Sequence, residues 1–296
     1  MDDWRELYPF ASRELSLGGL RYHYIDEGQG EPLLFVHGNP TWSFYYRNLI
    51  QAFRKDHRCI AVDHIGCGLS DKPQDYNYSL EQHIINLLKL IETLDLQQVT
   101  IVGHDWGGAI SLGAALAVPQ RISRLVIFNT AAFPPPYIPW RIALCRLPWI
   151  GAVAVRSMNL FSRLALSMAV EKPERMTPAV QAGLLHPYDS WDNRIGVWRF
   201  VSDIPTAHTD PTWRMLTDIE QGVPSLDVKP VQMIWGMRDW CFTPECLARM
   251  EQMLPSAEVH RLEDCGHYVV EDAHERIIPL MREFFARHPV EQADSV

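Results

Sequence analysis

Four short apolar runs in the first half of this chain limit its fold more than any other feature. They are PLLFVH (32–37), CIAVDH (59–64), VTIVGH (99–104) and RLVIFNT (124–130). Strands buried on both faces of a parallel sheet show such continuous runs. Between the second and third runs, SLEQHIINLLKLIETLDL carries an apolar stripe at helical spacing, and Ser79 with Gln82 forms a capping box at its start. Strands that alternate with helices predict an α/β fold with a mostly parallel sheet and helices on both faces.

The alternation breaks after the fourth run. From residue 133 to 213 the chain is rich in Pro, Trp, Arg and Met, and it contains helical segments such as SMNLFSRLALSMAV but no convincing buried strand. PVQMIWGMRD (230–239) and AEVHRLEDCGH (257–267) then resume the strand-to-loop pattern. Two strands joined by a Gly-Gly turn precede the first run. The sequence therefore predicts a core domain of residues 1–132 and 214–296, with a helical cap domain, residues 133–213, inserted after the sixth strand.

Composition and charge exclude several classes of function. The 296 residues are 47% hydrophobic and 21% charged, as is typical of globular proteins. Because the net charge is −9, we expect no nucleic-acid partner and no firm association with a membrane, since either would select a basic face. No secretory signal or membrane span is recognisable, which predicts a cytoplasmic protein. The six cysteines have no paired spacing, and neither a metal nor a cofactor is expected. The sequence is compatible with a homo-oligomer.

The segment VGHDWGGAI (102–110) places Asp105 between Gly103 and Gly107, at the turn from a strand to a helix. Gly-x-Ser-x-Gly is the usual pattern of such an elbow, whose glycines relieve crowding around a strained central residue. The elbow presents that residue at the carboxyl end of the sheet, where ligands bind, and the following helix favours a negative charge there. We predict that Asp105 is an ionised nucleophile rather than only a helix N-cap.

Two further residues complete a predicted catalytic triad. His267 follows the last strand and Asp239 follows the strand before it, which is the chain order of nucleophile, acid and base in this architecture. We predict that His267 is the general base and that Asp239 orients it. Asp239 has two local alternatives, a pair with Arg238 and a cap on the next helix. His37 and His64 also end strands, but the glycine motifs beside them indicate roles in shaping loops.

Two residues are predicted to supply N–H donors. Asn39, in HGNP, follows the first apolar run, and Trp106 directly follows Asp105. We expect their backbone N–H groups to form an oxyanion hole. Their side chains add an amide and an indole N–H, which would bind a compact anion in an apolar cavity. Most tryptophans pack in protein cores, and only the position next to the nucleophile distinguishes Trp106.

At these residues the sequence resembles the haloalkane dehalogenases of the α/β-hydrolase superfamily. The likeness is carried by HGNPTWSFYYRNLI, VDHIGCGLSDKP, VGHDWGG and CGHYVVED, and it runs from about residue 10 to 288. It implies the α/β-hydrolase fold and an attack of Asp105 on a halogen-bearing carbon. Asn39 and Trp106 would then stabilise the departing halide. His267, held by Asp239, would activate water to hydrolyse the alkyl ester. The partners would be a small apolar substrate, water and a halide ion.

The cap sequence leaves alternatives open. It resembles a third branch of these dehalogenases, which is similar to the β-lactone decarboxylases of long-chain olefin synthesis and shares the same Asp, His and Asp. We place the dehalogenase ahead of this alternative. Weaker alternatives are an epoxide hydrolase, with Tyr137 and Tyr188 as its cap tyrosines, and a non-catalytic binding protein. Asn129 occupies the position of the acid in some dehalogenases but cannot ionise. Cap tryptophans that could add a halide contact are Trp140, Trp149, Trp191 and Trp198.

Overall fold

The computed structural model describes residues 4–290, except for the side chain of Pro148, and these residues contain one eight-stranded sheet. The strand order is β1-β2-β4-β3-β5-β6-β7-β8. β2 pairs antiparallel with β1 and β4, and all later pairs are parallel. The strands are β1 (Ser12–Leu17), β2 (Leu20–Glu27), β3 (Pro32–Val36), β4 (Arg58–Val62), β5 (Val99–Gly103), β6 (Ile122–Phe128), β7 (Val231–Gly236) and β8 (Glu258–Leu262). The predicted fold class is confirmed.

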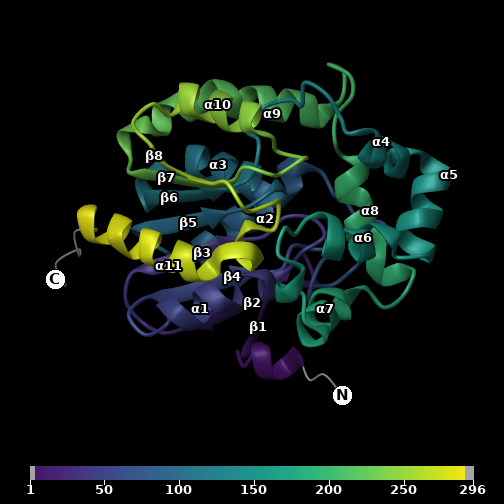
Figure 1. Cartoon of the computed structure of the whole chain (residues 1–296), viewed down its shortest axis with the longest axis horizontal. Helices are drawn as coiled ribbons and strands as arrows, with labels where there is room; N and C mark the ends of the chain where they lie inside the picture. Colours follow the sequence, from purple (N-terminus) through teal and green to yellow (C-terminus); the bar gives the residue numbers. More distant parts are fainter. Residues whose placement is uncertain (1–3, 291–296) are drawn as a thin grey trace.

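Helices cover both faces of the sheet (Figure 1). One face carries α2 (Leu80–Thr93), α3 (Trp106–Ala117), α9 (Pro211–Gly222) and α10 (Pro244–Met253), and the other carries α1 (Arg47–Phe53) and α11 (Val269–Arg287). α2 begins at the predicted cap, where the Gln82 backbone N–H donates to Ser79 Oγ at 3.3 Å. The Gln82 amide donates to Asn86 at 3.1 Å instead of returning to Ser79, so only half of the capping box forms.

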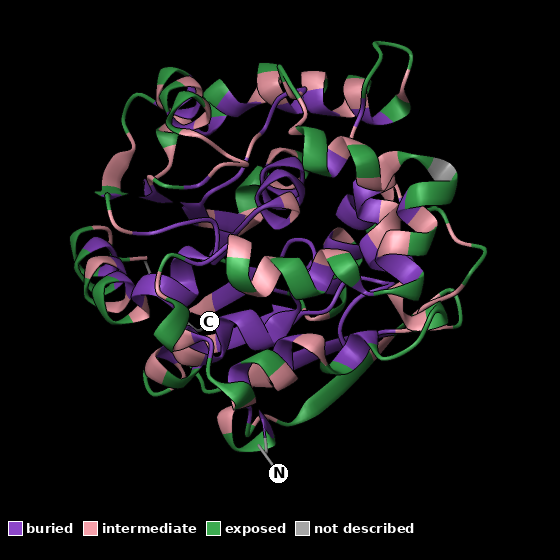
Figure 2. Ribbon diagram, turned by 45° about the vertical axis from the view of Figure 1, so that its right-hand side comes forward, coloured by how far each residue is buried: buried purple, intermediate pink, exposed green. Residues whose placement is uncertain are grey.

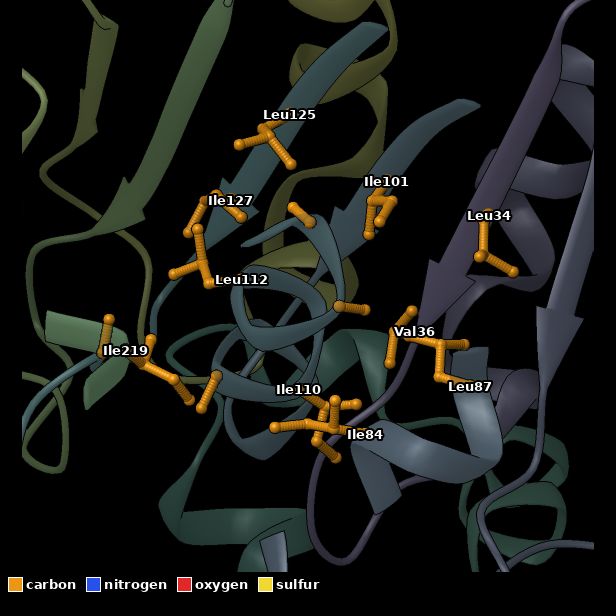
Figure 3. Packing of buried hydrophobic residues seen from close by; sticks show 14 of the residues in the cluster. Leu34, Val36, Ile84, Leu87, Ile101, Ile110, Leu112, Leu125, Ile127 and Ile219 are labelled. Carbon is orange, nitrogen blue, oxygen red and sulfur yellow. The ribbon is translucent and has the colours of Figure 1, made fainter. Parts of the chain in front are cut away.

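The alternating side chains of the strands supply two hydrophobic cores, one on each face. Along β3, Leu34 and Val36 belong to one core, and Leu33 and Phe35 belong to the other. Figure 3 shows the first of these cores, in which β3, β5 and β6 face α2 and α3. Each fully buried aliphatic side chain contributes about 1.5–3 kcal/mol to folding. In Figure 2 the central strands are buried beneath the outer helices, whereas β1 at the edge of the sheet is exposed. We call the carboxyl ends of the parallel strands the platform.

Besides three short 3₁₀ helices, five α-helices and a π-helical turn lie between β6 and α9 in the described residues. They are α4 (Trp140–Arg146), α5 (Pro148–Gly151), the π-helical turn Ala152–Ser157, α6 (Leu160–Met168), α7 (Pro178–Leu185) and α8 (Ile195–Ser202). They gather beside one edge of the core, on the right in Figure 1. No residue described between Phe128 and Val231 is in a strand, as expected for an insertion after the sixth strand. The domain limits at residues 133 and 213 stay a prediction. Within residues 4–290, no helix is both long enough and apolar enough to span a membrane.

Candidate active site

The carboxyl end of β5 turns into α3 through Asp105. Its backbone has φ 54° and ψ −131°, a conformation that residues with a side chain rarely adopt. Gly107 makes the turn possible, because a Cβ there would lie 2.1 Å from the carbonyl oxygen of Val36. The Asp105 N–H donates to the Asn129 carbonyl at 2.9 Å, and the Thr130 hydroxyl donates to the Asp105 carbonyl at 2.5 Å. These contacts hold the strained residue in place.

The Asp105 side chain is buried, but it makes no helix-capping hydrogen bond. Its Oδ1 accepts the backbone N–H of Asn39 at 2.7 Å, and its Oδ2 lies 3.8 Å from Nε2 of His267. A Cβ on Gly38 would come within 2.2 Å of Oδ1, so only glycine leaves room for the carboxylate. One oxygen is therefore held by the backbone, while the other faces the imidazole.

His267 lies in the loop between β8 and α11 and is held from three sides. Its Nδ1 donates to Asp239 Oδ2 at 2.8 Å, and its ring stacks on Phe242. His104, directly before the elbow, donates from Nε2 to the His267 carbonyl at 2.9 Å. Asp239 is itself fixed, because its Oδ1 accepts the backbone N–H groups of Cys241 at 2.7 Å and Phe242 at 3.1 Å. The imidazole is therefore oriented with Nε2 toward Asp105.

For both Asp105 and His267, burial and neighbouring charges shift the pKa in opposite directions. Burial raises the pKa of the Asp105 carboxyl above its usual value, and His267 and the backbone N–H groups of Trp106 and Asn39 offset this only in part. Burial lowers the pKa of His267, but Asp239 and Asp105 outweigh it, so the pKa is raised overall. An ionised Asp105 beside a protonated His267 leaves neither buried charge unpaired. The ionisation of Asp105 therefore depends on burial, His267 and the backbone N–H groups together, and not on the N-terminus of α3 alone.

A cavity of about 890 Å³ lies between the platform and the cap, and Asp105 and His267 form part of its wall. Asn39 and Trp106 also line it, whereas Asp239 is buried behind His267. Most of the remaining wall is apolar and comes from the cap. The volume lies near the upper end of the range of roughly 300–1,000 Å³ that is usual for small-molecule sites. The structure thus brings the five predicted site residues together at one cavity.

The two predicted side-chain donors are not equivalent. Within residues 4–290, the Trp106 indole N–H has no hydrogen-bond partner. The Asn39 amide donates to the Val197 carbonyl at 3.2 Å, and its Oδ1 is buried without a partner. The reverse orientation of the amide would bring two acceptor oxygens together, so the Val197 carbonyl decides which way the amide faces. Asn39 therefore keeps only one side-chain N–H for a ligand.

Several residues considered for other roles lie away from the reacting groups. The Tyr188 hydroxyl donates to the Thr41 carbonyl at 3.0 Å and is not part of the cavity wall, although Tyr137 is. The tyrosine pair of an epoxide hydrolase is therefore not assembled. Of the four cap tryptophans, Trp140 lines the cavity, whereas the other three do not: Trp149, Trp191 and Trp198. No group of three or more His, Cys, Asp or Glu in the described residues is arranged to hold a metal ion.

Three supporting residues were not predicted. Asn129 donates to the Gly236 carbonyl at 3.0 Å and accepts the Gly236 N–H at 2.8 Å, which joins the ends of β6 and β7. His104 and Phe242 support His267 as described above. His104 lies within VGHDWGG, Asn129 lies near the end of the fourth apolar run, and Phe242 comes three positions after Asp239; this proximity was the only available signal. His37 and His64 bind each other's loops, with His64 N–H donating to His37 Nε2 at 3.0 Å, in line with their expected loop-shaping role.

The comparisons with known proteins show the family of the chain. The sequence profile of the α/β-hydrolase fold family matches residues 31–151 and 153–273. The chain belongs to the α/β-hydrolase family. A cis-3-alkyl-4-alkyloxetan-2-one decarboxylase from Shewanella oneidensis is 43% identical over 284 residues, which are 94% of this chain and 89% of the relative. Haloalkane dehalogenase 2 from Mycobacterium tuberculosis is 33% identical over 295 residues, 95% and 96% of the two chains. The crystal structure of a haloalkane dehalogenase from Agrobacterium tumefaciens superposes with a TM-score of 0.84 at 25% identity, over 94% and 96% of the two chains.

These findings confirm the predicted superfamily and change the order of the two candidate activities. The relative named as a decarboxylase shares 43% of its aligned residues with this chain, against 33% for the relative named as a dehalogenase. The comparisons therefore favour the activity that the sequence placed second. The roles of Asp105, His267, Asp239, Asn39 and Trp106 stay predictions.

Proposed function

We propose that this protein decarboxylates β-lactones that carry two alkyl substituents and releases an alkene and carbon dioxide. The observation that carries the proposal is the Asp105 carboxylate in the wall of a large apolar cavity, with Oδ1 held by a backbone N–H and Oδ2 facing His267. The 43% identity to a cis-3-alkyl-4-alkyloxetan-2-one decarboxylase supports this substrate class. Alkyl chains form no hydrogen bonds, so the apolar wall accommodates them without leaving polar groups unpaired.

In the first step, Oδ2 of Asp105 attacks C4, the ring carbon that carries the lactone oxygen. The bond between Asp105 and C4 forms, the C4–O bond breaks, and its electron pair leaves as a carboxylate attached to C3. Opening relieves the strain of the four-membered ring, and no proton moves. The departing carboxylate takes the place of the halide in a dehalogenase, with the side-chain N–H groups of Trp106 and Asn39 as its donors.

In the second step, carbon dioxide leaves from C3. The electron pair of the broken C–C bond forms the C3=C4 double bond, while the C4–O bond to Asp105 breaks and returns the carboxylate. Attack from the side opposite the ring oxygen inverts C4, which places the bond to Asp105 antiperiplanar to the bond that breaks at C3. A cis lactone therefore gives a cis alkene, and neither water nor a proton is consumed.

His267 has a different task here from its task in ester hydrolysis. Its raised pKa favours an imidazolium ion near Asp105 Oδ2, and a fixed positive charge stabilises the carboxylate before attack and after release. An imidazolium ion also takes no proton from water, which protects the ester from hydrolysis to a β-hydroxy acid. Asp239 holds the ring in position for both purposes.

Haloalkane dehalogenation is the second candidate, and the unpartnered Trp106 indole N–H in the cavity wall favours it. In that reaction Asp105 forms an alkyl ester with release of halide. A neutral His267 must then remove a proton from water to hydrolyse the ester. In both reactions Asp105 forms the first bond to the substrate. Decarboxylation requires a protonated His267, whereas dehalogenation requires a neutral one.

Parallel assays with two substrates test the proposal. The wild-type protein receives a cis-3,4-dialkyl β-lactone or a 1-bromoalkane of matched length, and alkene, carbon dioxide and bromide are measured. We expect alkene and carbon dioxide in equal amounts, and bromide release slower by at least about 100-fold. Bromide release without alkene formation would overturn the proposal in favour of dehalogenation.

The variant His267→Gln separates the two mechanisms. With the lactone it should still form alkene, at a rate reduced about tenfold to 100-fold, because no proton transfer is required. With the bromoalkane it should stop after one turnover, and mass spectrometry should find an alkyl group on Asp105. A complete loss of alkene formation in a correctly folded variant would contradict the proposed task of His267.

A further inference from the structure

One segment of the cap carries most of the exposed large apolar side chains of the described residues. Thirteen such side chains are exposed in the described residues, and ten of them lie between Tyr137 and Leu164. We call residues 137–164 the cap face; it comprises α4, α5, the π-helical turn and the first part of α6, and it lies on the right in Figure 1. Trp149 is 87% exposed and Trp140 is 67% exposed. Apolar groups gathered in this way on a soluble protein mark a binding surface.

The cap face is basic, although the chain as a whole is acidic. Residues 133–170 contain four arginines and no Asp or Glu, in a chain of net charge −9. Arg156 is buried and donates to Gln74. Arg141 and Arg163 are exposed, and neither forms an ion pair with any residue from 4 to 290. An apolar surface with unpaired arginines is complementary to an anionic lipid surface.

Part of the cavity wall is formed by exposed side chains of the cap face. Six of the exposed large apolar side chains also line the cavity: Tyr137, Trp140, Leu144, Ile150, Leu160 and Leu164. Exposed Pro136, Arg141 and Glu245 line it as well. We therefore take the six apolar residues as the rim of the cavity. An apolar molecule that enters there stays in contact with apolar side chains on its way to Asp105. The active site and the cap face are thus two ends of one apolar path.

We propose that the cap face docks on the surface of an anionic lipid bilayer, from which the active site takes its lipophilic substrate directly. Trp149 and Met158 would insert among the lipid headgroups, and Arg141 and Arg163 would meet lipid phosphates. The helices of the cap face have four to nine residues, so they lie on the bilayer and do not cross it. The docking surface follows from exposure and charge, and only the delivery of substrate rests on the proposed function.

Charge also argues against a second copy as the occupant. A two-fold contact through the cap face would place arginines of one copy against arginines of the other, without an acidic residue from this segment to pair them. The proposal departs from the expectation drawn from net charge, because net charge averages over an acidic core and a basic cap face. Lipid phosphates supply the negative charge that residues 133–170 lack.

Sedimentation of the full-length protein with large vesicles tests the docking surface without any substrate. Vesicles of phosphatidylcholine with phosphatidylglycerol are compared with vesicles of phosphatidylcholine alone. We expect the wild-type protein to partition onto the anionic vesicles at least about tenfold more strongly, and salt at about 0.5 M to remove most of this preference.

Variants outside the cavity wall locate the contact. Trp149→Ser combined with Met158→Ser should lower partition about tenfold, and Arg163→Glu should lower it about fivefold. Val228→Ser and Arg13→Glu are matched controls, since Val228 is also 87% exposed and Arg13 is exposed on β1, both outside the cap face. The controls should partition like the wild-type protein.

Three results would overturn the proposal: a wild-type protein that stays in the supernatant, cap-face variants that bind vesicles as strongly as the wild type, or a wild-type dimer that Trp149→Ser dissociates. The last result, seen by light scattering, would assign the cap face to a second copy. Turnover of a short-chain lactone in lipid-free solution reports on the proposed function alone. It should be equal in the wild-type protein and these variants, so a failure of docking is distinguishable from a failure of the proposed function.

Discussion

The floor of the active site and the cap face are built in opposite ways. At the floor, both Asp239 oxygens accept hydrogen bonds, His267 is held from three sides, and the elbow is tied to β6. On the cap face, ten large apolar side chains are exposed and two exposed arginines have no acidic partner in residues 4–290. Contacts within the chain therefore fix the reacting atoms. The apolar side chains and arginines of the cap face have no such contacts, and only a partner outside the chain could provide them.

The largest expected effect concerns the floor. Asp105→Ala should lower lactone turnover by more than about 10⁴-fold, because it removes the cavity-lining carboxylate that faces Nε2 of His267. The variant should fold at least as stably as the wild type near neutral pH, since burial raises the pKa of Asp105 and so disfavours its ionised form. Gas chromatography of the alkene and thermal unfolding followed by circular dichroism check both statements. Exposed Asp75→Ala is the control, and residual turnover in Asp105→Ala would remove Asp105 from the mechanism.

The second effect compares a buried arginine of the core with an exposed one of the cap face. Arg47 forms a buried bidentate pair with Glu271, with distances of 2.5 and 2.8 Å. Arg47→Ala leaves the Glu271 carboxylate without its partner and should reduce the free energy of unfolding by about 3–5 kcal/mol. Arg163→Ala should change it by less than about 0.5 kcal/mol. Urea titration measures both, and equal losses would mean that the two regions are not built differently.

The pH profile of turnover gives a smaller but mechanistic effect. Lactone turnover should fall at low pH as Asp105 becomes protonated, and its raised pKa moves this loss above the usual value of 3.8. It should also fall at high pH as His267 loses its proton, at a raised pKa that lies above 6.5. On each side of the pH optimum, the rate of lactone turnover should change by about tenfold per pH unit, to within a factor of two. Bromoalkane turnover should instead rise with pH as His267 becomes neutral, and the same rise with the lactone would contradict an imidazolium ion.

The smallest expected effect separates two tryptophans of the cap face. Trp149 does not line the cavity, so Trp149→Ser should change the free energy of unfolding by less than about 0.5 kcal/mol and leave turnover of a short-chain lactone unchanged. Trp140 is exposed and also lines the cavity, so Trp140→Ser should raise KM for a long-chain lactone about threefold with little change in kcat. Steady-state kinetics checks both variants. Identical kinetics would show that the rim does not contact the substrate.

Much of the site was predictable because its residues follow the carboxyl ends of parallel strands. Parallel strands end at one edge of a sheet, so Asp105, Asp239 and His267 had to converge once the strands were recognised. The supporting contacts were less accessible. The Asn39 amide donates to the Val197 carbonyl, which belongs to a cap helix 158 positions later. No local sequence pattern predicts a contact over that distance along the chain. The same holds for Tyr188, whose hydroxyl the structure directs to Thr41 and not to the cavity.

The amino-acid sequence by itself determined the sheet, the elbow and the order of the polar residues along the platform, because apolar periodicity and chain order are local properties. Only the tertiary structure decided which donors remain free at the cavity, which tyrosine and tryptophan side chains reach it, and that exposed apolar residues of the cap surround its mouth. These features depend on which surfaces of distant segments meet. Whether an apolar side chain ends in a core or on a rim is decided by packing and not by its residue type.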